Sequence, residues 1–580
     1  MVFLCLLGGA LDIYDPVLPK NTGAVLRAIE EKTTLPVTEW AQAITGTPIS
    51  QAAPKRDVVQ AAMDKVIESQ EIEQAAKELI TLKHIKFQGV TILGDMELHG
   101  LMAPFLNTPM SYEQMLEIGM VVESYYRQNN YLARAILPPQ DLTEGTLLVD
   151  VIESVFSKVE IEQELQDLPN TQAHVTALIE NQQKAGEPLN TKSIDRALAL
   201  ANDLPGLNVQ GSLRQGREAG ETELLLKLYQ GRTRQTELSV DNGGSRSTGA
   251  IRLMATLNWF NPNDIADLLN VVAVHTQGSD YARLAYSVPV GSDGWRMGIN
   301  ASAMDYKVIV GEQGMVGAIG RALTQGLEWV YPLLRADDSS ATVTVSADKK
   351  TFQNTSAQGL LMSDYQSKVL TAQLSGFYRD LNPGGGTGTY SIQLSNGEVD
   401  LTGSLSQQTD KNTTKTEGVF NKLRLNGTWQ QAINTQTSTF ISYTAQLADK
   451  NLDSSEKMQL GGMNGVRAYP TGEGSGAEGQ LVQLELRHQL ENGINLAAFY
   501  DWGQVWLQHD PNYPGGPAHN VNIYKGIGAS VGYTFDNGMS IKGTWARKHG
   551  DNPNPNPING HDMDGTRDRN RYWLQVNLPF

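Results

Sequence analysis

Hydrophobic and polar residues alternate with a period of two from about residue 233 to residue 580. The segment "WRMGINASA" is an example, because every second residue in it is apolar: Trp295, Met297, Ile299, Ala301 and Ala303. The segments "AIRLMATLNW" and "YARLAYSVPV" alternate in the same way. Successive side chains of a strand point to opposite sides, so this alternation predicts strands with one apolar and one polar face.

The length of these segments favours an all-β transmembrane barrel over residues 233–580. Each runs to about ten residues, the length that a tilted strand needs to cross a bilayer. Long polar loops such as "KHGDNPNPNPINGHDMDGTRD" alternate with short turns. At about 20 to 22 residues per strand with its connection, the region holds roughly 16 antiparallel strands. A soluble β-sandwich is the alternative, since its strands alternate too.

Residues 81–232 show helical spacing instead, in two similar units. The first unit (81–153) contains the helix start Ser111 with Gln114 three residues later, and the second (154–232) contains the helix start Asn190. In each unit a strand and two helices precede two strands joined by a glycine-containing turn, for example "LNVQGSLR" and "ETELLLKLY". The sequence therefore predicts two α+β units in the order β-α-α-β-β.

The first 80 residues have a different character. Residues 1–15 begin with "MVFLCLLGGA", which we interpret as the remnant of a signal peptide that lacks its positively charged start. Residues 16–80 contain the helical patch "NTGAVLRAIEE" and a connector rich in Pro, Thr and Ser. No apolar run of about 18 residues follows the start, which excludes membrane-spanning helices.

Composition and motifs argue against several classes of function. The formal net charge is -17 and no basic block occurs, so we expect no nucleic-acid partner. The single cysteine, Cys5, allows neither an intramolecular disulfide nor a thiolate metal site. The stretch "GSGAEG" (474–479) precedes a strand where a dinucleotide site needs a helix. His561, Asp562 and Asp564 are interpreted as a solvated loop tip, so we expect no enzyme activity, no cofactor and no metal.

A glycine-rich loop carries the most informative pair of charges. The segment 461–480, "GGMNGVRAYPTGEGSGAEGQ", contains a single cation, Arg467. A buried guanidinium needs a carboxylate partner. In the strand "INLAAFYDWGQVW", parity places Phe499, Asp501 and Gly503 on the face opposite Leu496, Tyr500 and Trp502. Asp501 therefore points into the lumen of the predicted barrel.

These two segments resemble motifs of a known family. "FYDWG" matches an F-x-D-x-G strand motif, and "GVRAYPTGEG" resembles the V-R-G-[FY] loop of the two-partner secretion transporters (TpsB family, FhaC/ShlB/HecB type), which are related to the barrel-assembly protein BamA. Ala468 departs from the commoner glycine of that loop. The resemblance implies that the two α+β units are POTRA domains and that Arg467 meets Asp501 inside the barrel. Its motif positions in this chain are Val466, Arg467, Tyr469, Phe499, Asp501 and Gly503.

The resemblance also implies a function and a location. The chain is expected to export a large TpsA-type exoprotein, namely an adhesin, a haemolysin or a contact-dependent toxin, across the Gram-negative outer membrane. The POTRA domains would lie in the periplasm, and the patch "GAVLRAIEE" resembles the helix that plugs the pore in that family. Phe580 resembles the C-terminal signal read by the barrel-assembly machinery. Outer-membrane lipid and a monomeric state are further expectations; the alternatives are a BamA-like assembly factor and a passive porin.

Overall fold

The computed structural model describes residues 79–580 except 164, 166, 312–315, 383 and 558, and these residues form two units, 79–231 and 232–580. The expected signal remnant (1–15) and almost all of the expected helix and linker (16–80) lie outside the described residues. Among the described residues, no helix is both long enough and apolar enough to cross a bilayer.

The first half of the N-proximal unit contains a three-stranded sheet and two α-helices. Its elements are β1 (Ile80–Thr81), β2 (His84–Gln88), α5 (Asp95–Met102), a 3-10 turn η1 (Ala103–Phe105), β3 (Pro109–Met110), α6 (Tyr112–Gln128), β4 (Ala133–Ile136) and β5 (Thr146–Glu153). The strand order is β2-β5-β4. Helix α6 begins with a capping box in which the Ser111 hydroxyl accepts from the Gln114 amide, as the sequence predicts. The short pair β1–β3 was not predicted.

The second half of this unit follows the predicted order β-α-α-β-β. Its elements are β6 (Val155–Gln163), α7 (Pro169–Gln182), α8 (Thr191–Asn202), β7 (Leu207–Gln215) and β8 (Glu221–Gln230). Strand β8 lies between β6 and β7. The Asn190 side chain accepts a hydrogen bond from the Ser193 amide and caps α8, which confirms the predicted helix start. Apolar residues of both helices and of β8 are buried between helices and sheet, among them Val175, Leu178, Ile194, Leu224 and Leu226.

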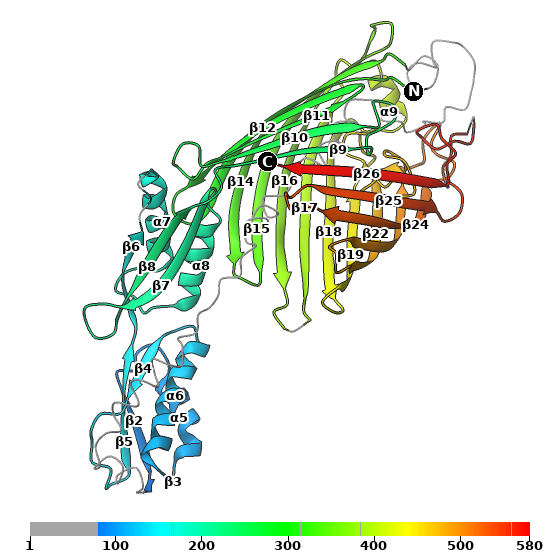
Figure 1. The fold of residues 1–580 in the computed structure, drawn as a ribbon. Helices are drawn as coiled ribbons and strands as arrows, with labels where there is room; N and C mark the ends of the chain where they lie inside the picture. Colours follow the sequence, from blue (N-terminus) through cyan, green and yellow to red (C-terminus); the bar gives the residue numbers. More distant parts are fainter. Residues whose placement is uncertain (1–78, 164, 166, 312–315, 383, 558) are drawn as a thin grey trace. The chain divides into compact units, whose positions relative to one another are not determined.

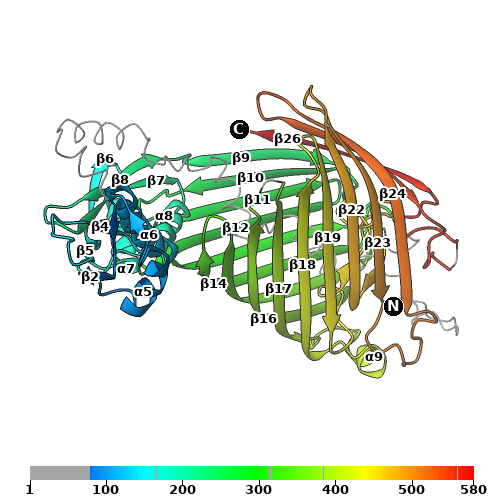
Figure 2. The same cartoon turned by 90° about the horizontal axis from the view of Figure 1, so that it is seen from below.

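The second unit is a closed antiparallel barrel of 16 strands, which confirms the fold class predicted from alternation (Figures 1 and 2). The strands are β9 (Arg234–Asp241), β10 (Arg252–Phe260), β11 (Leu268–Thr276), β12 (Ser279–Val290), β13 (Trp295–Lys307), β14 (Ile319–Arg335), β15 (Ser340–Thr355), β16 (Leu361–Arg379), β17 (Gly386–Asp400), β18 (Gly418–Ala432), β19 (Thr437–Ala448), β22 (Glu478–Gln489), β23 (Asn495–Trp506), β24 (Val521–Thr534), β25 (Ser540–Lys548) and β26 (Asn570–Pro579). A short helix, α9 (Gln407–Asn412), lies between β17 and β18.

Strand lengths vary more than the alternation predicts. Strand β9 has 8 residues and β16 has 19. The longer strands result from pairing that continues through their polar ends, for example between Gln353 of β15 and Asp364 of β16. Alternation of apolar residues marks only the part of a strand that faces lipid, so it underestimates the length of these strands.

The barrel closes where its last strand meets its first (Figure 1). Strand β26 pairs with β9 from Gln575 opposite Asp241 to Pro579 opposite Glu237. The amide of Phe580 then donates to the carbonyl oxygen of Thr236 at 2.8 Å, which extends the pairing by one residue beyond β26. The described C-terminal residue is thus part of the closing seam.

Candidate functional site: the inserted loop and its anchor

The glycine-rich segment is part of a long loop between β19 and β22. Two short strands, β20 (Met458–Gln459) and β21 (Ser475–Gly476), pair with each other and form the neck of this inserted loop. Residues 460–474 form its tip, and Leu460, Val466, Ala468 and Tyr469 in the tip are almost completely buried. Because lumen-facing wall residues pack against them, the tip lies inside the barrel.

Arg467 and Asp501 form an ion pair inside the barrel, as the family resemblance implies. The guanidinium donates from Nε to Asp501 Oδ2 at 2.9 Å and from Nη2 to Asp501 Oδ1 at 2.6 Å. The Arg467 amide also donates to Asp501 Oδ2, at 3.0 Å. Arg467 is 4% exposed and Asp501 is 0% exposed, so the pair is shielded from solvent. Two parallel bonds from a planar guanidinium fix direction as well as distance.

Glu485 of β22 is a second carboxylate partner that the sequence reasoning missed. Arg467 Nη1 donates to Glu485 Oε1 at 2.6 Å. The other oxygen of Glu485 accepts from Arg487 Nε at 2.7 Å. Glu485 pairs with Phe499 in the ladder between β22 and β23, and Phe499 is two residues from Asp501. The parity argument that located Asp501 finds Glu485 too, when it is applied to "LVQLELRHQ".

Phe499 contacts the guanidinium from the wall. The Arg467 Cζ atom lies 3.4 Å from the centre of the Phe499 ring. A guanidinium stacked on an aromatic face combines cation–π attraction with apolar contact. The fold therefore brings together four of the motif residues, Val466, Arg467, Phe499 and Asp501.

Two glycines of the wall make room for the loop tip. A Cβ atom at Gly503 would lie 3.0 Å from Leu460 Cδ1 and 3.1 Å from Val466 Cγ2. A Cβ atom at Gly526 of β24 would lie 2.7 Å from the Cβ of Ala468. The alanine that departs from the commoner loop motif is therefore accommodated by a glycine on the facing strand.

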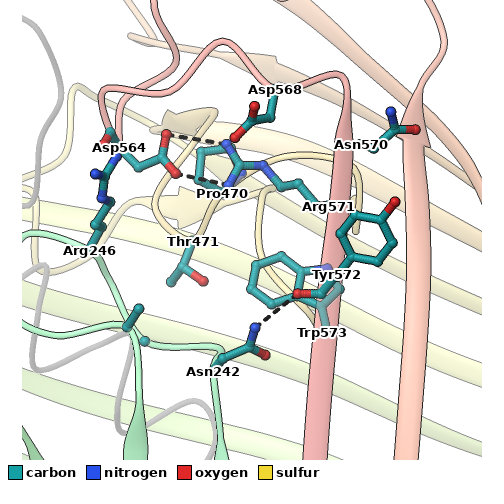
Figure 3. Close-up of a pocket in the computed structure, with 12 residues that line it drawn as sticks. Asn242, Arg246, Pro470, Thr471, Asp564, Asp568, Asn570, Arg571, Tyr572 and Trp573 are labelled. Carbon is teal, nitrogen blue, oxygen red and sulfur yellow. Dashed lines mark hydrogen bonds and ion pairs between the residues drawn. The ribbon is translucent and has the colours of Figure 1, made fainter.

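The loop tip also contacts both sides of the closing seam. Trp573 Nε1 of β26 donates to the Arg467 carbonyl oxygen at 2.8 Å. Thr471 Oγ1 donates to the Gly243 carbonyl oxygen, just after β9, at 2.9 Å. Figure 3 shows Thr471 between the segment that carries Asn242 and the strand that carries Trp573. Tyr469, the remaining loop residue of the motif, packs edge-on against Tyr524 with ring centres 4.9 Å apart.

The segment 549–569 corrects one sequence interpretation. Asp562 is 4% exposed and is not part of a solvated loop tip. It pairs with Lys548 and with Arg571, whose Nη2 lies 2.9 Å from Asp562 Oδ2. Asp564 pairs with the same arginine at 2.8 Å. Among the described residues, no group of three or more His, Cys, Asp or Glu side chains is arranged to hold a metal ion.

Phe580 and the outer face of β26 carry the expected apolar surface. Tyr572, Leu574 and Phe580 are 69%, 54% and 77% exposed. Trp573 points the other way and is buried at the loop tip. The alternation of β26 thus separates a lipid-facing row from the residue that holds the loop.

Comparison with known proteins decides the family. The family model described as haemolysin secretion/activation protein ShlB/FhaC/HecB matches residues 220–535. The chain belongs to this family. A ShlB-type POTRA domain matches residues 80–154, the first half of the N-proximal unit. The chain is therefore an outer-membrane transporter of the two-partner secretion type, which translocates a large partner exoprotein and carries its POTRA domains in the periplasm.

Individual relatives agree with this assignment. The heme/hemopexin transporter protein HuxB of Haemophilus influenzae is 25% identical over 83% of this chain and 84% of its own. The outer membrane transporter CdiB of Dickeya dadantii is 24% identical over 73% of this chain and 76% of its own. Among solved structures, CdiB from Escherichia coli is similar with a TM-score of 0.69 at 20% identity, covering 96% of this chain and 98% of its own.

The assembly-factor alternative has support from the fold alone. BamA from Haemophilus ducreyi, in a form lacking POTRA domains 1–3, has a TM-score of 0.50 at 14% identity and covers 87% of this chain and 100% of its own. This similarity shows a shared architecture. The family assignment, in contrast, rests on the sequence of the barrel region itself.

Proposed function

We propose that the transporter captures unfolded segments of its partner on the open strand edge of the second POTRA unit. The partner then passes through the barrel with no enzyme chemistry and no cofactor, and folding of the partner outside the cell supplies the driving force. A long β-helical adhesin, haemolysin or toxin fits this role. The proposal includes a monomeric chain in outer-membrane lipid, inserted by the barrel-assembly machinery through its Phe580 signal, and POTRA bounds of 81–153 and 154–232.

The outer edge of β7 is the observation that supports this proposal. Strand β7 lies at the edge of the sheet β6-β8-β7. The Gly216 amide donates to the Glu221 carbonyl. Along an antiparallel strand, residues that bond to the neighbouring strand alternate with residues whose backbone groups point away from it. In this register the backbone groups of Gln215, Leu213 and Gly211 therefore point away from β8. Within the described part of the chain, no hydrogen bond is made by these outward groups from Gly211 to Gln215.

The beginning of the same edge is capped by a side chain. Asn202 of α8 accepts from the Val209 amide at 2.8 Å and donates to the Val209 carbonyl at 2.9 Å. An extended segment therefore has room to pair from Gly211 onward. Leu213 is 41% exposed there, and Leu198 of α8 lies beside Gly211. Main-chain pairing beside apolar side chains binds many sequences, as a carrier of unfolded protein requires.

The other soluble sheet has a more protected edge at β4. The Ala135 amide donates to Glu123 of α6 at 3.2 Å. Gly119 of the same helix lies close to the Ala135 carbonyl, since a Cβ atom there would be 3.4 Å from that oxygen. Met120 and Leu116 of α6 are 57% and 39% exposed and offer apolar contact but no free edge. This difference favours β7 over β4 for strand pairing.

A proline substitution tests the role of the β7 edge. Leu213→Pro removes an outward amide without removing a bond to β8, which is the position where an edge strand tolerates proline. Leu213→Thr keeps the amide and the strand propensity and is the matched control. We expect Leu213→Pro to lower partner secretion per transporter in the outer membrane, and Leu213→Thr to secrete normally. Normal secretion by Leu213→Pro would contradict the proposal.

A further inference from the structure

The inserted loop has another buried charge in its first arm, 11 residues before Arg467. Glu456 precedes β20 and is 2% exposed. Its Oε2 lies 2.5 Å from Lys422 Nζ of β18, and its Oε1 lies 3.4 Å from Lys350 Nζ of β15. The two lysine side chains are 10% and 18% exposed.

Both lysines belong to the inner face of the barrel wall. Lys350 has the parity of the buried Phe352, and Lys422 has the parity of the buried Phe420. Two strands, β16 and β17, separate β15 from β18 in the barrel. One carboxylate of the loop therefore bridges two separate places on the wall.

The neighbouring residues hold the Glu456 backbone in place. Its amide donates to the Asp453 carbonyl at 2.9 Å, and the Asp453 carboxylate accepts from Tyr365 Oη of β16 at 3.2 Å. Gln446 of β19 donates from Nε2 to the Glu456 carbonyl at 2.9 Å and to the Ala477 carbonyl at 3.0 Å. The same amide group thus joins the two arms of the loop at its base.

The two ionic contacts of the loop lie on different sectors of the wall. Arg467 binds β22 and β23, whereas Glu456 binds β15 and β18. The tip is also held by Trp573 and Thr471, so the Glu456 contact adds an ionic restraint on the first arm, at β15 and β18. Removing one partner of either contact would leave the opposite charge buried without a counter-charge, which is costly.

We infer that Glu456 is a second positioning residue, which fixes the first arm of the inserted loop to the wall through Lys350 and Lys422. The inference goes beyond the proposed export function, and it rests on that function only where secretion is measured. The arm and the tip together then hold the loop across the lumen.

Channel recordings test this inference without any partner protein. The full-length transporter is placed in a planar bilayer, and Glu456→Gln is compared with the wild type and with Glu417→Gln, whose carboxylate lies outside the strands near Lys411. We expect Glu456→Gln to raise the ratio of high-conductance to resting states at least about tenfold, the factor that 1.4 kcal/mol produces. Glu417→Gln should match the wild type.

A triple variant separates positioning from stability. In Glu456→Gln with Lys350→Met and Lys422→Met, the two lysines are no longer left buried without Glu456, so the unfolding temperature should rise from that of Glu456→Gln toward the wild-type value. The conductance ratio should stay high, because the ionic contact is still missing. A wild-type ratio in Glu456→Gln, or in the triple variant, would overturn the inference. A raised ratio with normal secretion would support the anchor and contradict the need for a held loop in export.

Discussion

Arg467 acts through both its charge and its shape. It pairs with Asp501 and Glu485 and stacks on Phe499, so a lysine at this position would keep the charge and lose the paired bonds and the stacking. Exchanging the charges of positions 467 and 501 would place an introduced aspartate beside Glu485. We therefore expect such an exchange to recover only part of the function lost in a single substitution.

The contact between Ala468 and Gly526 gives a test at the scale of single atoms. Gly526→Ala should lower the free energy of unfolding by about 1 to 3 kcal/mol, since its new methyl group meets that of Ala468 in a packed interior. Ala468→Gly in the same chain should restore most of the loss. Urea unfolding in liposomes, followed by tryptophan fluorescence, measures this cycle.

A second glycine provides the control for that cycle. A Cβ atom at Gly543 would approach only Val531 Cγ1, at 3.9 Å. Gly543→Ala should therefore leave the free energy of unfolding nearly unchanged. If Gly526→Ala lowered the free energy of unfolding equally with and without Ala468→Gly, the proposed packing of the tip would be contradicted.

At the scale of elements, Glu153 fixes the connection between β2 and α5. It accepts hydrogen bonds from the hydroxyl groups of Thr91 and Tyr126 and from the amides of Thr91 and Ile92. Burial raises the pKa of Glu153, but these hydrogen bonds outweigh burial, and the pKa is lowered overall. A lowered pKa means that the folded state favours the ionised carboxylate.

This shift predicts a pH dependence in the first POTRA unit. The stabilisation by Glu153 is fully present above the unfolded-state pKa, ordinarily about 4.3, and is lost as the pH falls through the lower folded-state value. Hydrogen exchange at Thr91 and Ile92, corrected for the chemical exchange rate, should accelerate over that acidic range. Glu153→Gln should remove this pH dependence. If the Thr91 and Ile92 amides of the wild type exchanged no faster at low pH, the proposed role of Glu153 would be contradicted.

The sequence predicted elements well wherever a period was regular. Alternation identified the 16-stranded barrel, and parity placed Asp501 on the inner face. Glu485 was missed because the search for a partner of Arg467 stopped at one carboxylate. Glu456 was missed because no motif pointed to the strands that carry Lys350 and Lys422, although Lys422 lies 34 residues from Glu456, the same separation as between Arg467 and Asp501.

At the scale of the whole barrel, the inserted loop joins distant parts of the wall. Its contacts reach β15 and β18 through Glu456, β22 and β23 through Arg467, and β26 through Trp573. Thr471 adds a contact with Gly243, which lies just after β9 on the other side of the seam. A change in loop position would therefore alter several wall strands at once, including the strand that closes the barrel.

The most direct test of this account is the amount of partner exoprotein in the medium, divided by the amount of folded transporter in the outer membrane. Removing one partner of a buried ion pair costs about 3 to 5 kcal/mol, less where lumen water reaches the stranded charge, so we expect Arg467→Ala to lower this ratio at least about tenfold. Arg569→Ala, which breaks an exposed pair with Asp551, is the matched control and should secrete normally. We expect export to require the loop held by this pair; wild-type secretion by Arg467→Ala, with the barrel folded in the membrane, would contradict that expectation.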